Sequence, residues 1–118
     1  MSEALRQEAQ TILEVLSSMP FEDCYPLSRY FDDLPCDPGF YAVRHCLDGI
    51  LYIGISNNLR RRFRDGHKAL SWAFVDRLSP DDVRITSVAM GKRTPQQVEY
   101  LEALMIKSAR PRYNIRMK

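Results

Sequence analysis

The chain has 118 residues, of which 45% are hydrophobic and 27% are charged. This length fits one globular domain of about 100–150 residues. No apolar run approaches the roughly 18 residues of a membrane helix, and the acidic, polar start does not resemble a secretory signal. We therefore expect a cytoplasmic protein without membrane association.

The cysteines do not form a recognisable ligand pattern. Cys24, Cys36 and Cys46 include no C-x-x-C pair, and no histidine stands at a zinc-ligand spacing from them. An odd number of cysteines also argues against a disulfide framework. We expect reduced thiols and no structural zinc site.

The net charge of +2 conceals an uneven distribution. Residues 1–38 contain two basic and eight acidic side chains, a net charge of −6, whereas residues 39–118 have a net charge of +8. A basic body behind an acidic arm is typical of a polyanion-binding domain with an appendage. The alternative is a chance imbalance on helix surfaces. We predict an acidic N-terminal arm over 1–38 and a separate basic domain over 39–118.

The arm begins with an amphipathic pattern. Residues 3–18 place one apolar stripe at spacings of three and four, which predicts a helix that ends at Pro20. The stripe consists of Leu5, Ala9, Ile12, Leu13 and Leu16. Four prolines between positions 20 and 38 disfavour further helix, so this segment is expected to wrap irregularly against the body.

A β-hairpin follows the arm. Residues 39–45 and 50–55 are β-prone, and Asp48-Gly49 between them is a strong turn signal. If this dipeptide alone forms the loop, Tyr41 and Tyr52 share one face. In that register the face also holds Val43, His45, Gly54 and Ser56. The opposite, apolar face then consists of Phe40, Ala42, Leu51, Ile53 and Ile55.

The remaining elements alternate between helix and strand. Residues 56–66 predict a helix capped by Ser56 or Asn57 and ended by Gly66. A short helix over 68–78 and a strand over 83–90 follow, and Thr94 begins a capping-box helix that runs to about Ala109. The predicted fold is α+β, with a small, three-stranded, mainly antiparallel sheet flanked by helices and an N-terminal helical arm.

Two of these helices present polar side chains beside their buried faces. In the helix over 56–66, Arg62 flanks the apolar stripe and is the arginine best placed to reach the sheet. The other basic residues here are expected either to contact a nucleic-acid backbone or to be ordinary surface charge; they are Arg60, Arg61, Arg64 and Lys68. Glu102 borders the inward stripe of the last helix, so it is either paired in a salt bridge or a ligand.

Five motifs follow one another from the N-terminus: Gly39-Phe40-Tyr41, Leu51-Tyr52-Ile53-Gly54, Arg62, Leu101-Glu102 and Arg110-Pro111-Arg112-Tyr113-Asn114. This order and spacing resembles the GIY-YIG nuclease domain of certain homing endonucleases, excision-repair incision enzymes, structure-specific resolvases and restriction enzymes. The resemblance covers residues 39–114 and implies a metal-dependent endonuclease that hydrolyses DNA.

The resemblance also implies individual roles. Tyr41 and Tyr52 would bind and activate the attacking water, and Arg62 would stabilise charge on the phosphate. Glu102 would hold one Mg²⁺ or Mn²⁺ ion, for which a single carboxylate is sufficient. Asn114 would support the site.

A tyrosine needs help to act as a base. With an ordinary pKa of about 10, it is roughly one part in a thousand ionised at neutral pH. Cationic neighbours would favour the phenolate, and the candidates are Arg62, His67 and His45. Gly54 leaves space on the tyrosine face.

Two alternatives to an active nuclease remain. Ile55 stands where some relatives have lysine. Gly66 stands where many relatives have histidine or tyrosine, and the histidine of this chain lies one residue later, at His67. These departures favour a nucleic-acid-binding module without catalysis. The second alternative is an interaction protein whose acidic arm contacts a protein partner, mediates self-association or covers the basic face.

Overall fold

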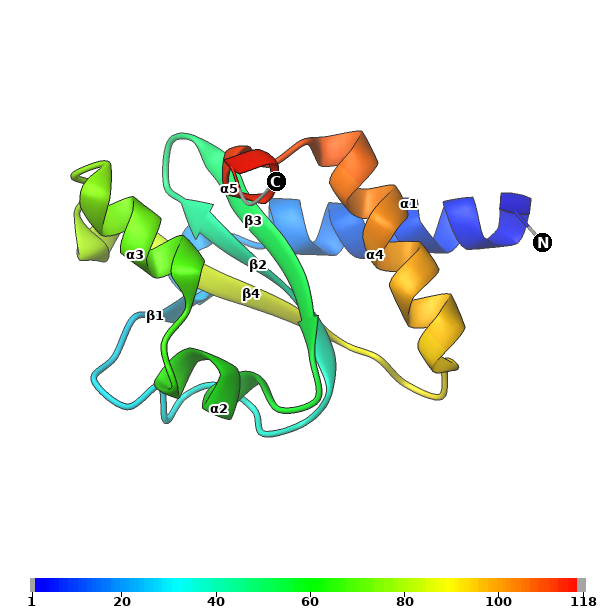
Figure 1. The fold of residues 1–118 in the computed structure, drawn as a ribbon, viewed down its shortest axis with the longest axis horizontal. Helices are drawn as coiled ribbons and strands as arrows, with labels where there is room; N and C mark the ends of the chain where they lie inside the picture. The colour runs from blue at the N-terminus through cyan, green and yellow to red at the C-terminus, as the bar shows by residue number, and fades with distance from the viewer. Residues whose placement is uncertain (1, 117–118) are drawn as a thin grey trace.

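The computed structural model describes residues 2–116, which form an antiparallel sheet with helices on both faces (Figure 1). The α-helices are α1 (Ser2–Ser18), α2 (Leu59–Arg64), α3 (Lys68–Val75), α4 (Pro95–Ala109) and α5 (Arg112–Arg116). The strands are β1 (Tyr25–Pro26), β2 (Gly39–His45), β3 (Gly49–Ser56) and β4 (Val83–Ala89). Two 3₁₀ turns, η1 (Phe21–Asp23) and η2 (Pro80–Asp82), complete the described elements.

The sheet order is β1-β4-β2-β3, and every pairing is antiparallel. The α+β class and the antiparallel sheet are confirmed. The prediction of three strands missed β1, a two-residue strand in the arm that pairs Tyr25 with Ile85. So short a strand leaves almost no period-two signal in the sequence.

Both faces of the sheet are covered. One core contains the stripe of α1 and the inward side of α4, represented by Leu16 and Leu101, packed on Phe40 and Ile53. The other core joins α2, α3 and α5 to the opposite face around Tyr41. Strand β2 lies in the middle of the sheet, and all seven of its residues are buried.

The hairpin has a different register from the one predicted for a two-residue loop. Tyr41 pairs with Gly54 and Val43 pairs with Tyr52, but a bulge then shifts the register so that His45 pairs with Gly49. Gly49 has φ +77°, a conformation that favours glycine. The bulge preserves a common face for the two tyrosines.

The bulge also explains why the predicted face of one residue was wrong. Leu51 packs in the core around Tyr41, whereas the predicted register assigned it to the opposite face. Only Phe40, Ala42, Ile53 and Ile55 of that predicted set pack with α1 and α4.

The helix boundaries follow the local capping chemistry. The N-cap of α2 is Asn58, whose side chain accepts the N–H of Arg61, so the predicted caps at Ser56 and Asn57 were wrong by one or two residues. Helix α2 has six residues and is therefore shorter than the helix predicted over 56–66. The limits of α4 match the prediction, and its capping box between Thr94 and Gln97 is present.

The arm contributes to the core of the body. The apolar stripe of α1 packs against α4 and the sheet, and Thr86 on β4 donates a hydrogen bond to the carbonyl of Leu16. The division at residue 38 remains a prediction. None of the helices within residues 2–116 combines the length and apolar character needed to span a bilayer.

Candidate active site

Tyr41 on β2 lies across the sheet pair from Gly54 on β3. The Tyr41 side chain is buried, and a Cβ atom added to Gly54 would lie 2.5 Å from its hydroxyl oxygen. A rigid aromatic ring cannot bend away from such a contact. The glycine of the second motif therefore provides the space that the phenol of the first motif occupies.

The hydroxyl of Tyr41 is hydrogen-bonded to His67. Its Oη lies 2.6 Å from Nε2 of the imidazole. The other ring nitrogen, Nδ1, accepts the backbone N–H of Ala69 at 3.0 Å and so caps α3. Because Nδ1 is an acceptor, the proton of the neutral imidazole lies on Nε2 and is donated to Tyr41 Oη.

His67 does not supply positive charge. Burial and the neighbouring Arg62 guanidinium lower its pKa to about 3, so the ring is neutral at physiological pH. The ring is also stacked on Phe63, with centroids 4.7 Å apart. His67 is therefore a neutral hydrogen-bond donor held in a fixed orientation, and not the cationic neighbour suggested from the sequence.

Tyr52 completes an aromatic cluster. Its ring centroid lies 6.1 Å from that of Tyr41 and 4.9 Å from that of His67. Unlike Tyr41, it is half-buried rather than fully buried, so one side remains open to a ligand. The sequence did not identify Phe63 as part of the site, because its spacing from Leu59 indicates only a buried helix face.

The electrostatic setting of the two phenols is mixed. Burial raises the pKa of Tyr41 well above its ordinary value, the adjacent Tyr52 adds to the rise, and Arg62 opposes it. Burial likewise raises the pKa of Tyr52. Arg62 is half-buried and donates from Nη1 to the Gly66 carbonyl at 3.2 Å, whereas Arg61 is exposed, as their positions on the helix predicted.

Glu102 on α4 acts electrostatically on both phenols. Its negative charge contributes to the raised pKa values of both Tyr41 and Tyr52. Burial, and then the nearby Glu99, raises the pKa of Glu102 itself. Among the side chains that the structure describes, no basic group comes within 4.0 Å of this carboxylate.

An unpaired, half-buried carboxylate is costly unless a cation compensates it. Glu102 lines an open cavity of about 600 Å³ together with Lys107, Arg110 and Asn114. Its chemistry fits an oxygen-seeking divalent ion, which keeps several waters and takes one or two carboxylates. The alternative of a salt bridge finds no partner in residues 3–116.

Asn114 secures the edge of the sheet beside Tyr52. Its Oδ1 accepts the N–H of Ile53 at 2.8 Å, and its Nδ2 donates to the Ile53 carbonyl at 2.9 Å. Because β3 is an edge strand, these two backbone groups have no strand partner on that side. The amide takes the place of a neighbouring strand and fixes β3 where it presents Tyr52.

Other predicted site residues lie elsewhere or are already engaged. His45 lies four residues from Tyr41 along β2, roughly 13 Å at about 3.3 Å per residue, and its Nδ1 accepts backbone N–H groups of the hairpin turn. Arg60 and Arg64 hydrogen-bond to the arm at Asp32. The two exposed members of the basic set without such a bond are Arg61 and Lys68.

The antiparallel hairpin, the paired phenols and the adjacent unpaired carboxylate together define a nuclease-type domain. The chain belongs to the family described as the GIY-YIG catalytic domain, whose model matches residues 37–114.

Several relatives share this region. The chain is similar to UvrABC system protein C of Anaeromyxobacter dehalogenans, with 31% identity over 99 residues, 78% of this chain and 13% of the relative. It is similar to the protein of the same name from Chlorobium chlorochromatii, with 33% identity over 78% of this chain and 15% of the relative. The Synechococcus elongatus protein is 34% identical over 73% of this chain and 13% of its own length.

The chain thus spans about one seventh of the length of these relatives. No solved structure gave a significant match.

Proposed function

We propose that this domain hydrolyses phosphodiester bonds of DNA with one divalent ion, Mg²⁺ or Mn²⁺, held by Glu102. The main support is the hydrogen bond between Tyr41 and His67, together with the unpaired Glu102 carboxylate that acts electrostatically on Tyr41. The net charge of +8 on residues 39–118 favours a polyanionic substrate. Membership of a catalytic-domain family supports the same reaction class.

In this proposal Tyr41 is the general base. Because His67 donates Nε2–H to the phenol oxygen, the hydroxyl proton of Tyr41 is not needed for that bond and can pass to solvent before the attack on the phosphate. The resulting phenolate keeps the same hydrogen bond, which stabilises its charge. It then removes a proton from the attacking water as the new oxygen–phosphorus bond forms and the bond to the leaving oxygen breaks.

The other residues position and neutralise the phosphate. Tyr52, half-buried beside Tyr41, orients the attacking water. Arg62 supplies positive charge where negative charge develops on the phosphate oxygens. A divalent ion at Glu102 would polarise the phosphate and neutralise the leaving oxygen, while Asn114 keeps β3 in place.

The direct test is cleavage of branched, nicked and linear DNA with added Mg²⁺ or Mn²⁺. Glu102→Gln should abolish cleavage and preserve folding, because the amide keeps the shape but loses the charge. Glu99→Gln is the matched control, since Glu99 is exposed one turn earlier on α4. Equal cleavage by wild type and Glu102→Gln would overturn the assignment.

A second candidate is a DNA-binding module without catalysis. The observation that favours it is Ile55, which packs against the core of α1 and α4 and offers no charge to the phenols. This candidate predicts salt-dependent DNA binding with no metal-dependent product from any of the three substrates.

The acidic arm suggests a further role, covering the basic face. The Asp32 backbone carbonyl accepts from Arg60, and its carboxylate accepts from Arg64 at 3.4 Å. Removing residues 1–38 would expose the core, so Asp32→Asn is the better test. Tighter DNA binding by this variant would support a covering role, and unchanged binding would exclude it for this contact.

A further inference from the structure

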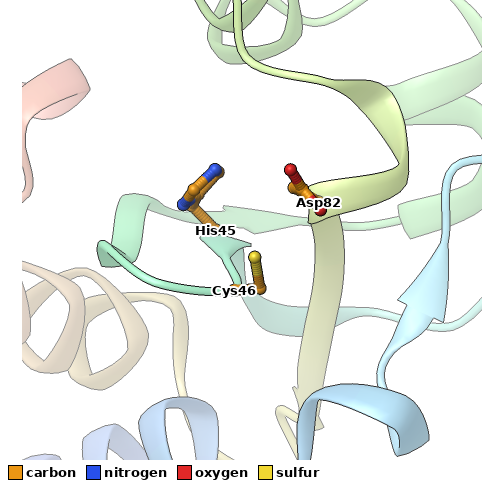
Figure 2. Close-up of side chains that lie close together, drawn as sticks. All are labelled: His45, Cys46 and Asp82. Atoms are coloured by element: carbon orange, nitrogen blue, oxygen red, sulfur yellow. The ribbon is translucent and has the colours of Figure 1, made fainter.

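A second cluster of metal-ligating side chains lies at the other end of β2. Figure 2 shows His45 at the end of the strand, Cys46 in the hairpin turn and Asp82 just before β4. The ligand atoms of these three side chains all lie within 4.8 Å of one another. This site could not be identified from the sequence, because Asp82 is remote from the His45-Cys46 pair along the chain.

The backbone holds the cluster together. The N–H of Cys46 donates to the carbonyl of Asp82 at 2.9 Å, which joins the hairpin turn to η2. His45 pairs with Val83 in the sheet. Cys46, which follows His45, and Asp82, which precedes Val83, are therefore also kept close together. The proximity of the three residues therefore follows from the sheet register.

The cluster is accessible and is separate from the tyrosine site. His45 is 8% exposed, whereas Cys46 and Asp82 both reach solvent. The distance of roughly 13 Å along β2 between His45 and Tyr41 places it beyond direct contact with the aromatic cluster. No step of the proposed hydrolysis uses these residues.

We infer that His45, Cys46 and Asp82 bind a transition-metal ion of the Zn²⁺ class, with water as the fourth ligand. An imidazole, a thiolate and a carboxylate are all established zinc ligands, and three protein ligands plus water is a common open zinc coordination. A thiolate–imidazole pair selects Zn²⁺ or Co²⁺ over Mg²⁺, which prefers oxygen ligands. The ion class thus differs from that expected at Glu102.

Binding requires only small movements. At metal–ligand distances of about 2.0–2.3 Å, two ligands of a tetrahedral ion lie about 3.5 Å apart. The separations of up to 4.8 Å must therefore close by roughly 1 Å. Rotation of the Cys46 and Asp82 side chains can provide this while the strand pairing is kept.

The histidine must change tautomer when it binds through Nε2. At present Nδ1 accepts the N–H groups of Leu47 and Asp48, at 3.2 Å each, so the ring proton lies on Nε2. In the metal-bound form this proton is on Nδ1. The N–H groups of Leu47 and Asp48 must then turn away from Nδ1, and the Asp48 carboxylate, 3.8 Å from Nδ1 and held by Arg112 at 2.6 Å, must move closer by roughly 1 Å to accept this proton. A carboxylate in that position is the arrangement that commonly orients metal-bound histidines.

The thiol must lose its proton. Local desolvation and the Asp82 carboxylate raise the pKa of Cys46, so it is a thiol in the metal-free protein. The metal–sulfur bond forms as the S–H bond breaks and the proton passes to solvent. The histidine tautomer change is neutral overall, so one proton is released for each ion bound.

Cobalt spectroscopy of the full chain tests this inference. Co²⁺ should produce a thiolate-to-cobalt charge-transfer band with one equivalent bound, and Zn²⁺ should remove the band by competition. Cys46→Ser should abolish it, and Asp82→Asn should weaken binding by at least about tenfold. Cys36→Ser is the matched control, because Cys36 is also an exposed cysteine, and it should keep the full band.

Thiol labelling gives a second readout on the wild-type chain and avoids any folding defect of a variant. Zn²⁺ should slow the alkylation of Cys46, as measured by mass spectrometry, and should leave the alkylation rate of Cys36 unchanged. Glu102→Gln should bind Co²⁺ like the wild type. Absence of the band, its persistence in Cys46→Ser, or equal labelling of Cys46 with and without Zn²⁺ would overturn the inference.

Discussion

The hydroxyl oxygen of Tyr41 occupies the space that any side chain on Gly54 would need, 2.5 Å from the Cβ position. Gly54→Ala should therefore displace the phenol. We expect a loss of about 1–3 kcal/mol in the free energy of unfolding from overpacking. Cleavage should fall by about 100-fold, the effect of moving a catalytic group by roughly 1 Å. Urea denaturation and the DNA cleavage assay measure the two effects.

Gly91→Ala separates these effects. Gly91 has φ +64°, so alanine strains its backbone, but the nearest atom to its Cβ position is 3.8 Å away and belongs to Arg93. This variant should lose stability and keep cleavage. If Gly54→Ala cleaved as well as Gly91→Ala, the fit between Gly54 and Tyr41 would have no catalytic importance.

Asn114 gives the second prediction. Asn114→Ala removes both hydrogen bonds to Ile53 and leaves a buried N–H and C=O without partners. At about 1–3 kcal/mol for each unsatisfied group, we expect the free energy of unfolding to fall by about 2–6 kcal/mol. Asn57→Ala, at an exposed asparagine, should change it by less than about 0.5 kcal/mol. Equal effects of the two substitutions would contradict this account.

The sequence predicted those parts of the fold that depend on local chemistry. The start of α4 follows from Thr94, the proline after it and Gln97, which act within one turn. The position of Leu51 could not be predicted, because it depends on a bulge set by the pairing of two strands. Helix α5 was missed because its five residues follow Pro111 and show too short a pattern.

The candidate site, too, could be predicted from the sequence only in part. The resemblance selected Tyr41, Tyr52, Arg62 and Glu102, and these groups influence one another electrostatically in the structure. The protonation state of His67 could not be read from the sequence, since it depends on burial and on the bond that caps α3. Their catalytic roles remain proposals.

The raised pKa of Tyr41 predicts a particular pH–rate profile. In the proposed mechanism the reactive form is the phenolate, whose fraction increases tenfold per pH unit below the pKa. Since burial raises that pKa above its ordinary value of about 10, the logarithm of the cleavage rate should rise with a slope near one between pH 6 and 9. Tyr41→Phe should flatten the profile. A plateau beginning between pH 6 and 7 would instead indicate a base with a pKa in that range.

His67 predicts how stability responds to acid. Its pKa is about 3 in the folded chain and about 6.5 in the unfolded chain. Between these values the unfolded state binds more protons, so this residue lowers the free energy of unfolding as the pH falls from 6.5 toward 3. The slope approaches about 1.4 kcal/mol per pH unit. Above pH 7 it contributes no pH dependence.

The variant that isolates this effect is His67→Asn. Asparagine is a good N-cap and can accept the N–H of Ala69, but it does not titrate. Urea denaturation at pH 7.5, 6, 5 and 4 should therefore show a steeper loss of stability in the wild type than in His67→Asn. Parallel curves over this range would mean that the wild-type imidazole becomes protonated without unfolding, and the bond between a neutral Nε2–H and Tyr41 would then need to be reassigned.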